Sequence, residues 1–399
     1  MEVVFVFDML RSVPRVVFLI VAAHSVTDLS QGALLVALPY FKAKFALSYT
    51  QVSAIALLQN LTSSVIQPVF GYYSDKNHRP WLMAAGCAVS GLAMLGSLLA
   101  PNYYILLLCT VVSGLGIAAF HPEGAKTVNR LSGAGKGKGV SMFVVGGNAG
   151  FALGSLFMGF LLTSVPEGMF WLYLIPFLGI SIPLYRMAMT LPRPESKAAG
   201  LGDLKCLISV PLAALLGVVL VRATVSAGIS TFIPLYYVSY LSGNAVYASW
   251  LLTVFLAGGA LGTLCGGILS DRYGSKRIML WSILPISLLL VLFQSMSGVW
   301  VFIVLALASA FLSAAFAGGL VLAQCMMPGN VGMASGLTIG FSVGLGGMGV
   351  LLLGRIADLW SLPLVFDLLA ILPVVGFVCT FFVRDVVRER EPQISLETK

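Results

Sequence analysis

The stretch GYYSDKNHR (residues 71–79) decides the interpretation of this chain, because a related stretch, GILSDRYGSKR (residues 267–277), follows it much later. Each has a glycine four residues before an aspartate, with basic residues directly behind. Each is expected to lie in a short charged break between two long apolar segments. Only 10% of the chain is charged, so a pattern repeated at a distance of 196 residues indicates a duplicated feature rather than chance.

The composition predicts an all-α polytopic membrane protein. Hydrophobic residues make up 59% of the chain and the mean hydropathy is +0.99, which leaves too little polar surface to cover a soluble particle. In lipid only helices or closed barrels satisfy the backbone, and long continuous apolar runs exclude the alternating strands of a barrel. The net charge of +8 is not gathered on a soluble basic face, so no nucleic-acid partner is expected. The six cysteines show no CxxC spacing, so neither a metal site nor a disulfide framework is expected, and no cofactor is indicated.

Twelve apolar segments are long enough to cross a bilayer, which takes about 20 residues of helix. Turn residues separate them, such as Pro101-Asn102 and Ser242-Gly243-Asn244. The predicted spans are residues 15–40, 49–70, 81–100, 103–125, 138–164, 168–191, 207–237, 245–268, 277–297, 299–324, 332–356 and 363–383.

Lysine and arginine indicate the orientation. Of the 23 basic residues, only Lys42, Lys44 and Arg355 fall on the side opposite the N-terminus, and Arg222 falls inside a span. By the positive-inside rule both termini are cytoplasmic, and we expect a multi-pass protein of the cell (inner) membrane. Residues 1–14 are the expected cytoplasmic N-terminal segment and residues 384–399 the expected cytoplasmic tail.

The chain divides into two similar halves. A polar linker over residues 192–206 is expected to join one six-helix half, residues 15–191, to a second, residues 207–383. Pro39 and Pro234 match at an offset of 195, close to the offset of the charged stretches. Two such halves, related by an axis along the membrane normal, are typical of rocker-type secondary transporters.

The charged stretches and the twelve-helix plan resemble the major facilitator superfamily over essentially the whole chain. The resemblance implies that the two loops lock the cytoplasmic side in the outward-open state. An aspartate there can accept from the N-terminus of a helix in the other half, and a glycine permits close helix approach. The alternative is that the basic residues only set the topology. The residues that match the signature are Gly71, Asp75, Lys76 and Arg79 in the first copy, and Gly267, Asp271, Arg272 and Lys276 in the second.

A narrower resemblance rests on four further stretches. These are HSVTDLSQ (residues 24–31), FHPE (120–123), VGGNAGFALG (145–154) and GLTIGFSVGLGG (336–347). Together they look like the fosmidomycin resistance protein group, which are bacterial inner-membrane drug exporters. The chain departs from many drug antiporters in having no arginine between Tyr103 and Phe120, and Phe151 where proline is usual, so their proton relay is not carried over.

Glycine recurs every fourth residue in the fifth and eleventh predicted spans. This spacing puts a smooth stripe on one helix face, which allows close contact and sliding between helices. Tight packing without motion is the alternative. The glycines are Gly146, Gly150, Gly154, Gly336, Gly340 and Gly344.

Ionisable residues deep inside spans are costly and indicate function. Asp28 lies roughly 20 Å and Arg222 roughly 25 Å into the membrane, at 1.5 Å per residue. They occupy nearly equivalent places in the two halves. His24 and Gln31 lie about one turn to either side of Asp28, so all three can share a face. A structural ion pair between Asp28 and Arg222 is the alternative to a functional role.

Three further candidates for substrate binding or proton coupling lie in the fourth and fifth spans: His121, Glu123 and Asn148. The alternative for Glu123, in the fourth span, is a structural role in a local ion pair with Lys126. Pro122 is expected to disturb the helix there and to expose carbonyl groups.

These features predict a secondary transporter that works by alternating access and is not an enzyme, since no catalytic or ATP-binding motif is present. The expected function is proton-coupled export of a small organic compound, with Arg222 attracting an anionic group and Asp28 carrying the proton. Proton-coupled uptake of a small anionic metabolite, or a transporter-like sensor, are the alternatives. The expected partners are the substrate, protons and membrane lipid, with a monomer as the functional unit.

Overall fold

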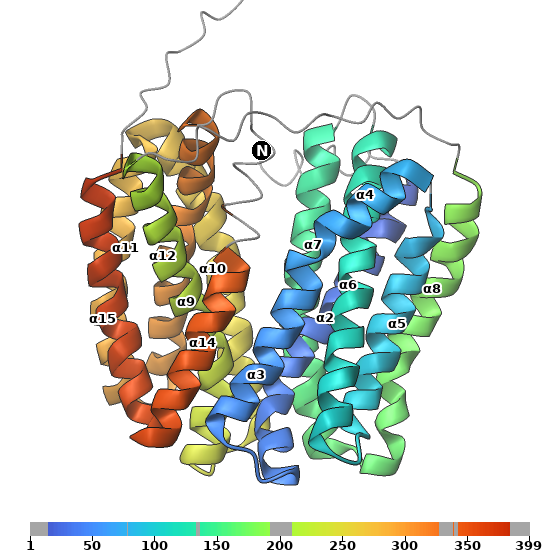
Figure 1. Ribbon diagram of the computed structural model, residues 1–399, viewed down its shortest axis with the longest axis horizontal. Coiled ribbons are helices and arrows are strands. Elements are labelled where there is room, and N and C mark those ends of the chain that lie inside the picture. Colours follow the sequence, from blue (N-terminus) through green and yellow to red (C-terminus); the bar gives the residue numbers. More distant parts are fainter. Residues whose placement is uncertain are drawn as a thin grey trace, which may run out of the picture.

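The computed structural model describes residues 15–77, 79–132, 136–191, 210–326, 338 and 342–383, and these residues form helices joined by short turns. The N-terminal half comprises α2 (Arg15–Lys44), α3 (Tyr49–Asn60), η1 (Leu61–Val65), α4 (Gln67–Asn77), α5 (Trp81–Leu98), α6 (Tyr103–Leu131), α7 (Lys136–Ser164), η3 (Glu167–Tyr173) and α8 (Leu174–Met189). The C-terminal half comprises α9 (Val210–Pro234), η5 (Leu235–Tyr240), α10 (Ala245–Tyr273), α11 (Ser275–Ser295), α12 (Val299–Met326), α14 (Ser342–Leu359) and α15 (Leu362–Phe381). The two halves stand side by side (Figure 1).

The all-α, twelve-span fold class is confirmed. Ten helical segments in the described part of the chain are long and apolar enough to cross a membrane. The second predicted span consists of α3, a π-helical turn (η1) and α4, which follow one another with a single bend at Ile66. The eleventh is represented by α14, and much of the segment before it lies outside the described residues.

Polar residues in the predicted turns begin several helices. Asn102 and Asn244 are extended N-cap residues whose side chains accept from the backbone N–H groups of Ile105 and Val246. Ser48 starts α3 with a capping box, in which its hydroxyl and the Gln51 side chain satisfy each other's backbone donors. These caps define where the chain re-enters the membrane.

The charged stretches are largely helical, which corrects the expectation of two charged breaks. α4 continues to Asn77, and α10 continues through its charged segment to Tyr273. Only Gly274 separates α10 from α11, with φ +91° and ψ 139°, a conformation that residues with a Cβ avoid. The helices extend beyond the apolar segments because a charged helix end can reach into the polar interface, where both backbone and side chains are solvated.

The halves contact each other mainly through two helix pairs, α7 with α10 and α3 with α14. We call the end where α8 finishes and α9 begins the linker end, and the opposite end, where α2 turns into α3, the far end (Figure 1). At the far end Asp358 of α14 accepts from the backbone N–H groups of Tyr49 (2.6 Å) and Thr50 (2.9 Å) and from the Thr50 hydroxyl (2.6 Å). A carboxylate at a helix N-terminus is favourable, so this contact joins the halves at the far end.

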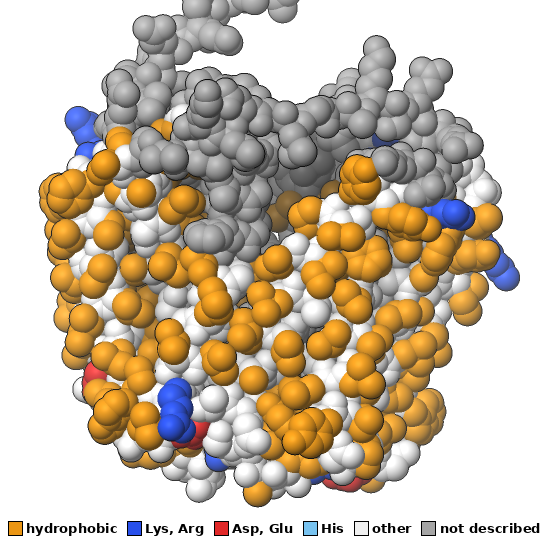
Figure 2. Space-filling model, in the orientation of Figure 1, with side chains coloured by type: hydrophobic (Ala, Val, Ile, Leu, Met, Phe, Trp, Pro, Cys, Tyr) orange, Lys and Arg blue, Asp and Glu red, His pale blue; other side chains and the backbone are white. Residues whose placement is uncertain are grey.

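The outer surface is that of a protein in lipid. Figure 2 shows hydrophobic side chains over the described face, with Lys and Arg towards the two ends. Large apolar side chains such as Leu264, Leu288 and Leu352 are more than half exposed. Such a continuous apolar surface fits a hydrocarbon environment, where it needs no protein partner.

The glycines of α7 pack against α2. A Cβ at Gly150 would overlap the backbone of Ser25, and one at Gly154 would overlap the backbone of Leu29. The Ser25 hydroxyl donates to the Gly146 carbonyl at 2.6 Å, across the same contact. These three glycines therefore set how closely α2 and α7 approach.

The glycines of the eleventh predicted span do not show such close packing in the part of the span that is described. A Cβ at Gly344 would meet Val65 at 3.4 Å, an ordinary contact, and Gly336 and Gly340 lie outside the described residues. A series that the sequence analysis did not single out lies instead on α10. There a Cβ at Gly258, Gly262 or Gly266 would overlap the α12 backbone.

Candidate functional site

The centre of the N-terminal half holds a buried cluster around Asp28. On α2, His24 lies one turn before Asp28, with its Nε2 3.2 Å from Oδ2. Gln31 lies almost one turn after and donates from Nε2 to Oδ1 at 2.9 Å. From α6, His121 places its Nε2 3.4 Å from Oδ1. The four candidates that the sequence places on two separate helices thus meet at one carboxylate.

Both imidazoles are held by their other nitrogen. His24 donates from Nδ1 to the Phe143 carbonyl of α7 at 2.7 Å, and His121 donates from Nδ1 to the Ile117 carbonyl at 2.8 Å. The His24 ring also stacks on Phe143, with centroids 3.8 Å apart, and on Phe120 at 5.7 Å. The orientation of His24 is therefore fixed by three helices, α2, α6 and α7.

These contacts determine how many protons the cluster needs. A backbone carbonyl only accepts, so each Nδ1 carries a hydrogen and each neutral imidazole presents a bare Nε2. The Nε2 atoms of His24 and His121 lie 3.0 Å apart, and both face the Asp28 carboxylate. Without another proton, all three groups would turn lone pairs towards one another. One proton shared among them converts this repulsion into charge-assisted hydrogen bonds.

Gly147 of α7 leaves space for the side chains of His24 and Asp28. The sequence did not lead us to expect that this glycine is needed by the cluster. A Cβ at this position of α7 would lie 2.5 Å from His24 Cε1, 2.6 Å from His24 Nε2 and 2.8 Å from Asp28 Oδ2. The signal was present, because Gly147 adjoins Gly146 and so falls outside the four-residue glycine period. A second glycine beside a stripe needs its own explanation.

The same three side chains could in principle share a metal ion. Their ligand atoms, one each from His24, Asp28 and His121, all lie within 4.8 Å of one another. The Nδ1 hydrogen bonds to carbonyls would also suit metal-bound histidines. The proton and the metal ion are distinguishable by experiment, as described below.

Other candidates in α6 and α7 are placed outside this cluster. Glu123 is buried and its Oε2 lies 2.8 Å from the Lys126 ammonium, so the local pair considered from the sequence is present. Asn148 is exposed on α7. Pro122, which was expected to disturb the helix, lies inside α6 and does not end it, since α6 continues to Leu131. A single missing backbone donor is tolerated in a membrane helix when the surrounding helices hold it in place.

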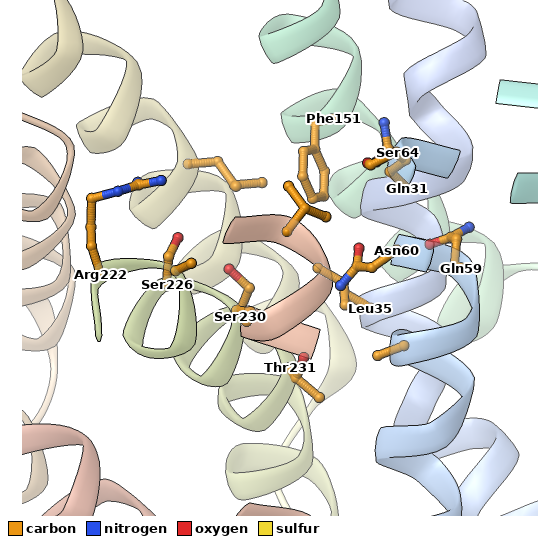
Figure 3. Close-up of a pocket in the computed structure, with 16 residues that line it drawn as sticks. Gln31, Leu35, Gln59, Asn60, Ser64, Phe151, Arg222, Ser226, Ser230 and Thr231 are labelled. Carbon is orange, nitrogen blue, oxygen red and sulfur yellow. The ribbon is translucent and has the colours of Figure 1, made fainter. Parts of the chain in front are cut away.

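A cavity of about 240 Å³ lies between the halves, next to the cluster (Figure 3). Arg222, Ser226 and Ser230 line it from successive turns of α9. Facing them are Gln31 of α2, Asn60 of α3 and other residues of the N-terminal half. The remaining lining residues are Leu35, Ala56, Gln59, Ser64, Phe151, Ala223, Ala227, Thr231, Leu256, Val343 and Gly346.

Arg222 is not paired with Asp28, so the structural ion pair considered from the sequence is not formed. Asp28 is satisfied by His24, His121 and Gln31, whereas the buried Nε of Arg222 has no hydrogen-bond partner in the part of the chain that the structure describes. The guanidinium carbon lies 4.5 Å from the centre of the Phe316 ring on α12. Gln31 donates a hydrogen bond to Asp28 and also lines the cavity that Arg222 lines, so it is next to both charged sites.

The loop-signature residues lie at the linker end. The side chains of Asp75, Lys76 and Asp271 fall outside the described set. Lys276 donates to the Phe381 carbonyl at 3.0 Å, within its own half, where it neutralises the C-terminus of α15. Arg79 and Arg272 are exposed.

The first glycine of that signature makes no tight contact in the described structure. Gly71 lies on α4, where a Cβ would meet Pro122 of α6 at 3.5 Å, an ordinary contact. Gly267 is half-buried on α10. Gly71 is therefore not required by a close approach of α4 to α6.

Two six-helix halves with a polar cavity between them define a polytopic membrane transporter rather than an enzyme. The family model of the Major Facilitator Superfamily matches residues 20–242 and 215–398. The chain belongs to the Major Facilitator Superfamily.

Two relatives match nearly the whole chain. The fosmidomycin resistance protein of Escherichia coli (strain K12) is 32% identical over 370 residues, covering 90% of this chain and 90% of that protein. An uncharacterized transporter of the superfamily, YfnC of Bacillus subtilis (strain 168), is 31% identical over 380 residues, covering 90% and 91%.

Solved structures share the fold at low sequence identity. The nucleoside transporter NupG superposes with a TM-score of 0.74 at 15% identity, covering 92% of this chain and 98% of that one. A D-xylose–proton symporter superposes with a TM-score of 0.68 at 12% identity, covering 92% and 96%. The arrangement of the helices is therefore that of superfamily transporters.

Proposed function

We propose that the protein is a proton-coupled exporter of a small organic compound, and that the His24–Asp28–His121 cluster carries the coupling proton. The observation that carries this proposal is the close approach of two Nε2 atoms and one carboxylate, which a shared proton makes favourable. A group that must hold a proton in one state and release it in another is what coupling to a proton gradient requires.

The cluster is placed to sense the substrate cavity. Gln31 donates to Asp28 and lines the cavity, so a compound that takes the Gln31 amide removes one hydrogen bond from the carboxylate. Cys87 on α5 and Glu123 on α6 are the other titratable groups close by, and Glu123 is already paired with Lys126. Substrate binding and proton affinity are therefore linked, and by reciprocity each changes the other.

Alternating access requires contacts between the halves that form and break. The bonds from Asp358 to the start of α3 favour a state closed at the far end. We further propose that the Asp75 and Asp271 stretches close the linker end in the opposite state. In this proposal the linker end is cytoplasmic, both termini are cytoplasmic, the membrane is the inner membrane and the monomer is the functional unit.

Export is favoured over uptake by the likeness to the fosmidomycin resistance protein. Proton-coupled uptake of a small anionic metabolite uses the same cluster and cavity, with the opposite coupling. Direction is therefore decided by experiment. A transporter-like sensor would bind its compound without moving it.

The test uses purified protein in proteoliposomes with an acidic interior and fosmidomycin outside. In this arrangement an antiporter accumulates the compound as protons leave, which mass spectrometry and an internal pH dye measure together. We expect accumulation that disappears when an ionophore collapses the gradient, and that His121→Gln lowers at least tenfold while Asn148→Ala leaves it unchanged.

Three outcomes contradict parts of this proposal. Accumulation driven only by an alkaline interior would indicate symport and therefore uptake. Accumulation that survives the ionophore would exclude proton coupling. Loss of transport in a strong chelator, with recovery on adding zinc, would assign the cluster to a metal ion instead of a proton.

A further inference from the structure

Arg222 is a largely buried cation that forms no ion pair with any of the described residues. It lies on α9 well inside the membrane-spanning part of the half, and its Nε is both inaccessible and without a hydrogen-bond partner. Its remaining exposure is to the cavity that it lines. Burying an unpaired charge is strongly unfavourable, so a guanidinium in such a place is expected to have a partner in some state of the protein.

The cavity cannot supply that partner from the described residues. None of the residues that line it is aspartate or glutamate, and Asp28, the nearest carboxylate on α2, is occupied by His24, His121 and Gln31. Phe316 covers the guanidinium on one side, with 4.5 Å from Cζ to the ring centre. An aromatic face stabilises a cation but leaves its N–H groups free to donate. An anion that enters the cavity from outside would supply the partner that the described lining residues do not.

The other residues that line the cavity indicate which further chemical groups the anion has. Ser226 and Ser230 lie four and eight residues after Arg222, on the same face of α9, and Asn60 faces them (Figure 3). These are neutral donors and acceptors, suited to hydroxyl and carbonyl groups. Phe151 and Leu35 add apolar surface. The volume, about 240 Å³, is below the 300–1,000 Å³ typical of drug-sized ligands.

We propose that Arg222 binds the anionic group of the transported compound, which is a small organic acid with a carboxylate or phosphoryl group and polar substituents. The planar fork of a guanidinium matches both of these groups with two parallel hydrogen bonds. This inference rests on the proposed transport function and narrows its substrate class. The serines along α9 then hold the remainder of the compound against the N-terminal half.

Binding is measurable without a gradient, which separates this inference from proton coupling. The purified protein is melted in detergent and chloride-free buffer with propylphosphonate or butyrate, and with butyramide as the uncharged match for butyrate. A ligand that binds only the folded state raises the melting temperature in a concentration-dependent way. We expect both anions to raise the melting temperature of the wild type, and butyramide to have at least tenfold lower affinity than butyrate.

The variants assign the effect to Arg222. Arg222→Gln should weaken binding of both anions at least tenfold, and Arg222→Lys should retain part of it because the charge remains and the fork is lost. Arg355→Gln removes the same group from an exposed position on α14 and should change nothing.

The opposite results overturn the inference. Equal binding of butyrate and butyramide, normal binding by Arg222→Gln, or an equal loss in Arg355→Gln would each show that Arg222 is not the anion site. Failure of both anions to stabilise the wild type would do the same. None of these results bears on whether Asp28 carries a proton, which the gradient experiment decides.

Discussion

The two halves of the molecule bury charge in opposite ways. In the N-terminal half, Asp28 is surrounded by His24, His121 and Gln31, and each imidazole has its second nitrogen bonded to a backbone carbonyl. In the C-terminal half, Arg222 stands at a nearly equivalent place in the sequence repeat, and among the described residues its one recorded partner is the face of Phe316. One charge is satisfied by the protein and the other is not.

This difference supports the two separate roles that were expected from the sequence. A satisfied cluster with one shared proton changes state by gaining or losing that proton, so it suits coupling. An unsatisfied cation is completed only by something from outside, so it suits binding. The contrast between the buried charges of the two halves therefore supports different roles for Asp28 and Arg222.

The largest expected effect comes from removing a partner of the satisfied charge. His24→Ala deletes a buried ring that stacks on Phe143 and leaves Asp28 with fewer partners, so we expect a loss of about 3 kcal/mol or more in stability. His121→Ala should cost less, because its side chain is 18% exposed against 6% for His24. Thermal melting of both variants in detergent checks this order, and a reversed order would break the description of the cluster.

A smaller effect is expected from crowding the same cluster. Gly147→Ala puts a methyl group within 3 Å of His24 and Asp28, so we expect a cost of roughly 1–3 kcal/mol and a clear loss of proton-driven accumulation. Gly217→Ala is the matched control, since its methyl group would meet Cys379 Sγ at an ordinary 3.6 Å. Equal transport by the two variants would show that the geometry around Asp28 is not needed.

The smallest expected effect is a gain in stability instead of a loss, and it concerns the unpaired charge of the C-terminal half. Arg222→Met replaces an unpaired buried cation by an apolar chain of similar length, so we expect the ligand-free protein to gain roughly 1 kcal/mol in stability while losing anion binding. The melting temperature without ligand, followed by the titration with propylphosphonate, measures both. A variant that is strongly destabilised would mean that Arg222 has a structural partner.

Much of the fold was predictable, because hydropathy and turn chemistry act locally. The twelve spans follow from uninterrupted apolar runs, and Asn102 and Asn244 begin helices where the sequence indicated turns. The lengths of the charged ends were less predictable. α10 reaches Tyr273 because charge does not end a helix at an interface, whereas Gly274 does, through its positive φ.

The residues of the site could be predicted from the sequence, but which of them contact each other could not. Spacing alone puts His24, Asp28 and Gln31 on one face of a helix, and depth alone marks Arg222 as unusual. The partnership of Asp28 with His121 depends on how α2 packs on α6, and the separation of Arg222 from Asp28 depends on how the two halves meet. Asp358 at the start of α3 was missed for the same reason, since 308 residues separate it from Thr50.

The central claim is that Asp28 carries the proton and Arg222 carries the substrate, and one pair of transport measurements tests it most directly. Proteoliposomes of wild type, Asp28→Asn and Arg222→Gln are assayed for exchange at equal pH and for accumulation against a pH gradient. The compound is fosmidomycin, or the anionic probe that binds most tightly. The account predicts that Asp28→Asn keeps exchange and loses accumulation, whereas Arg222→Gln loses both. Uphill accumulation by Asp28→Asn, or normal exchange by Arg222→Gln, would contradict it.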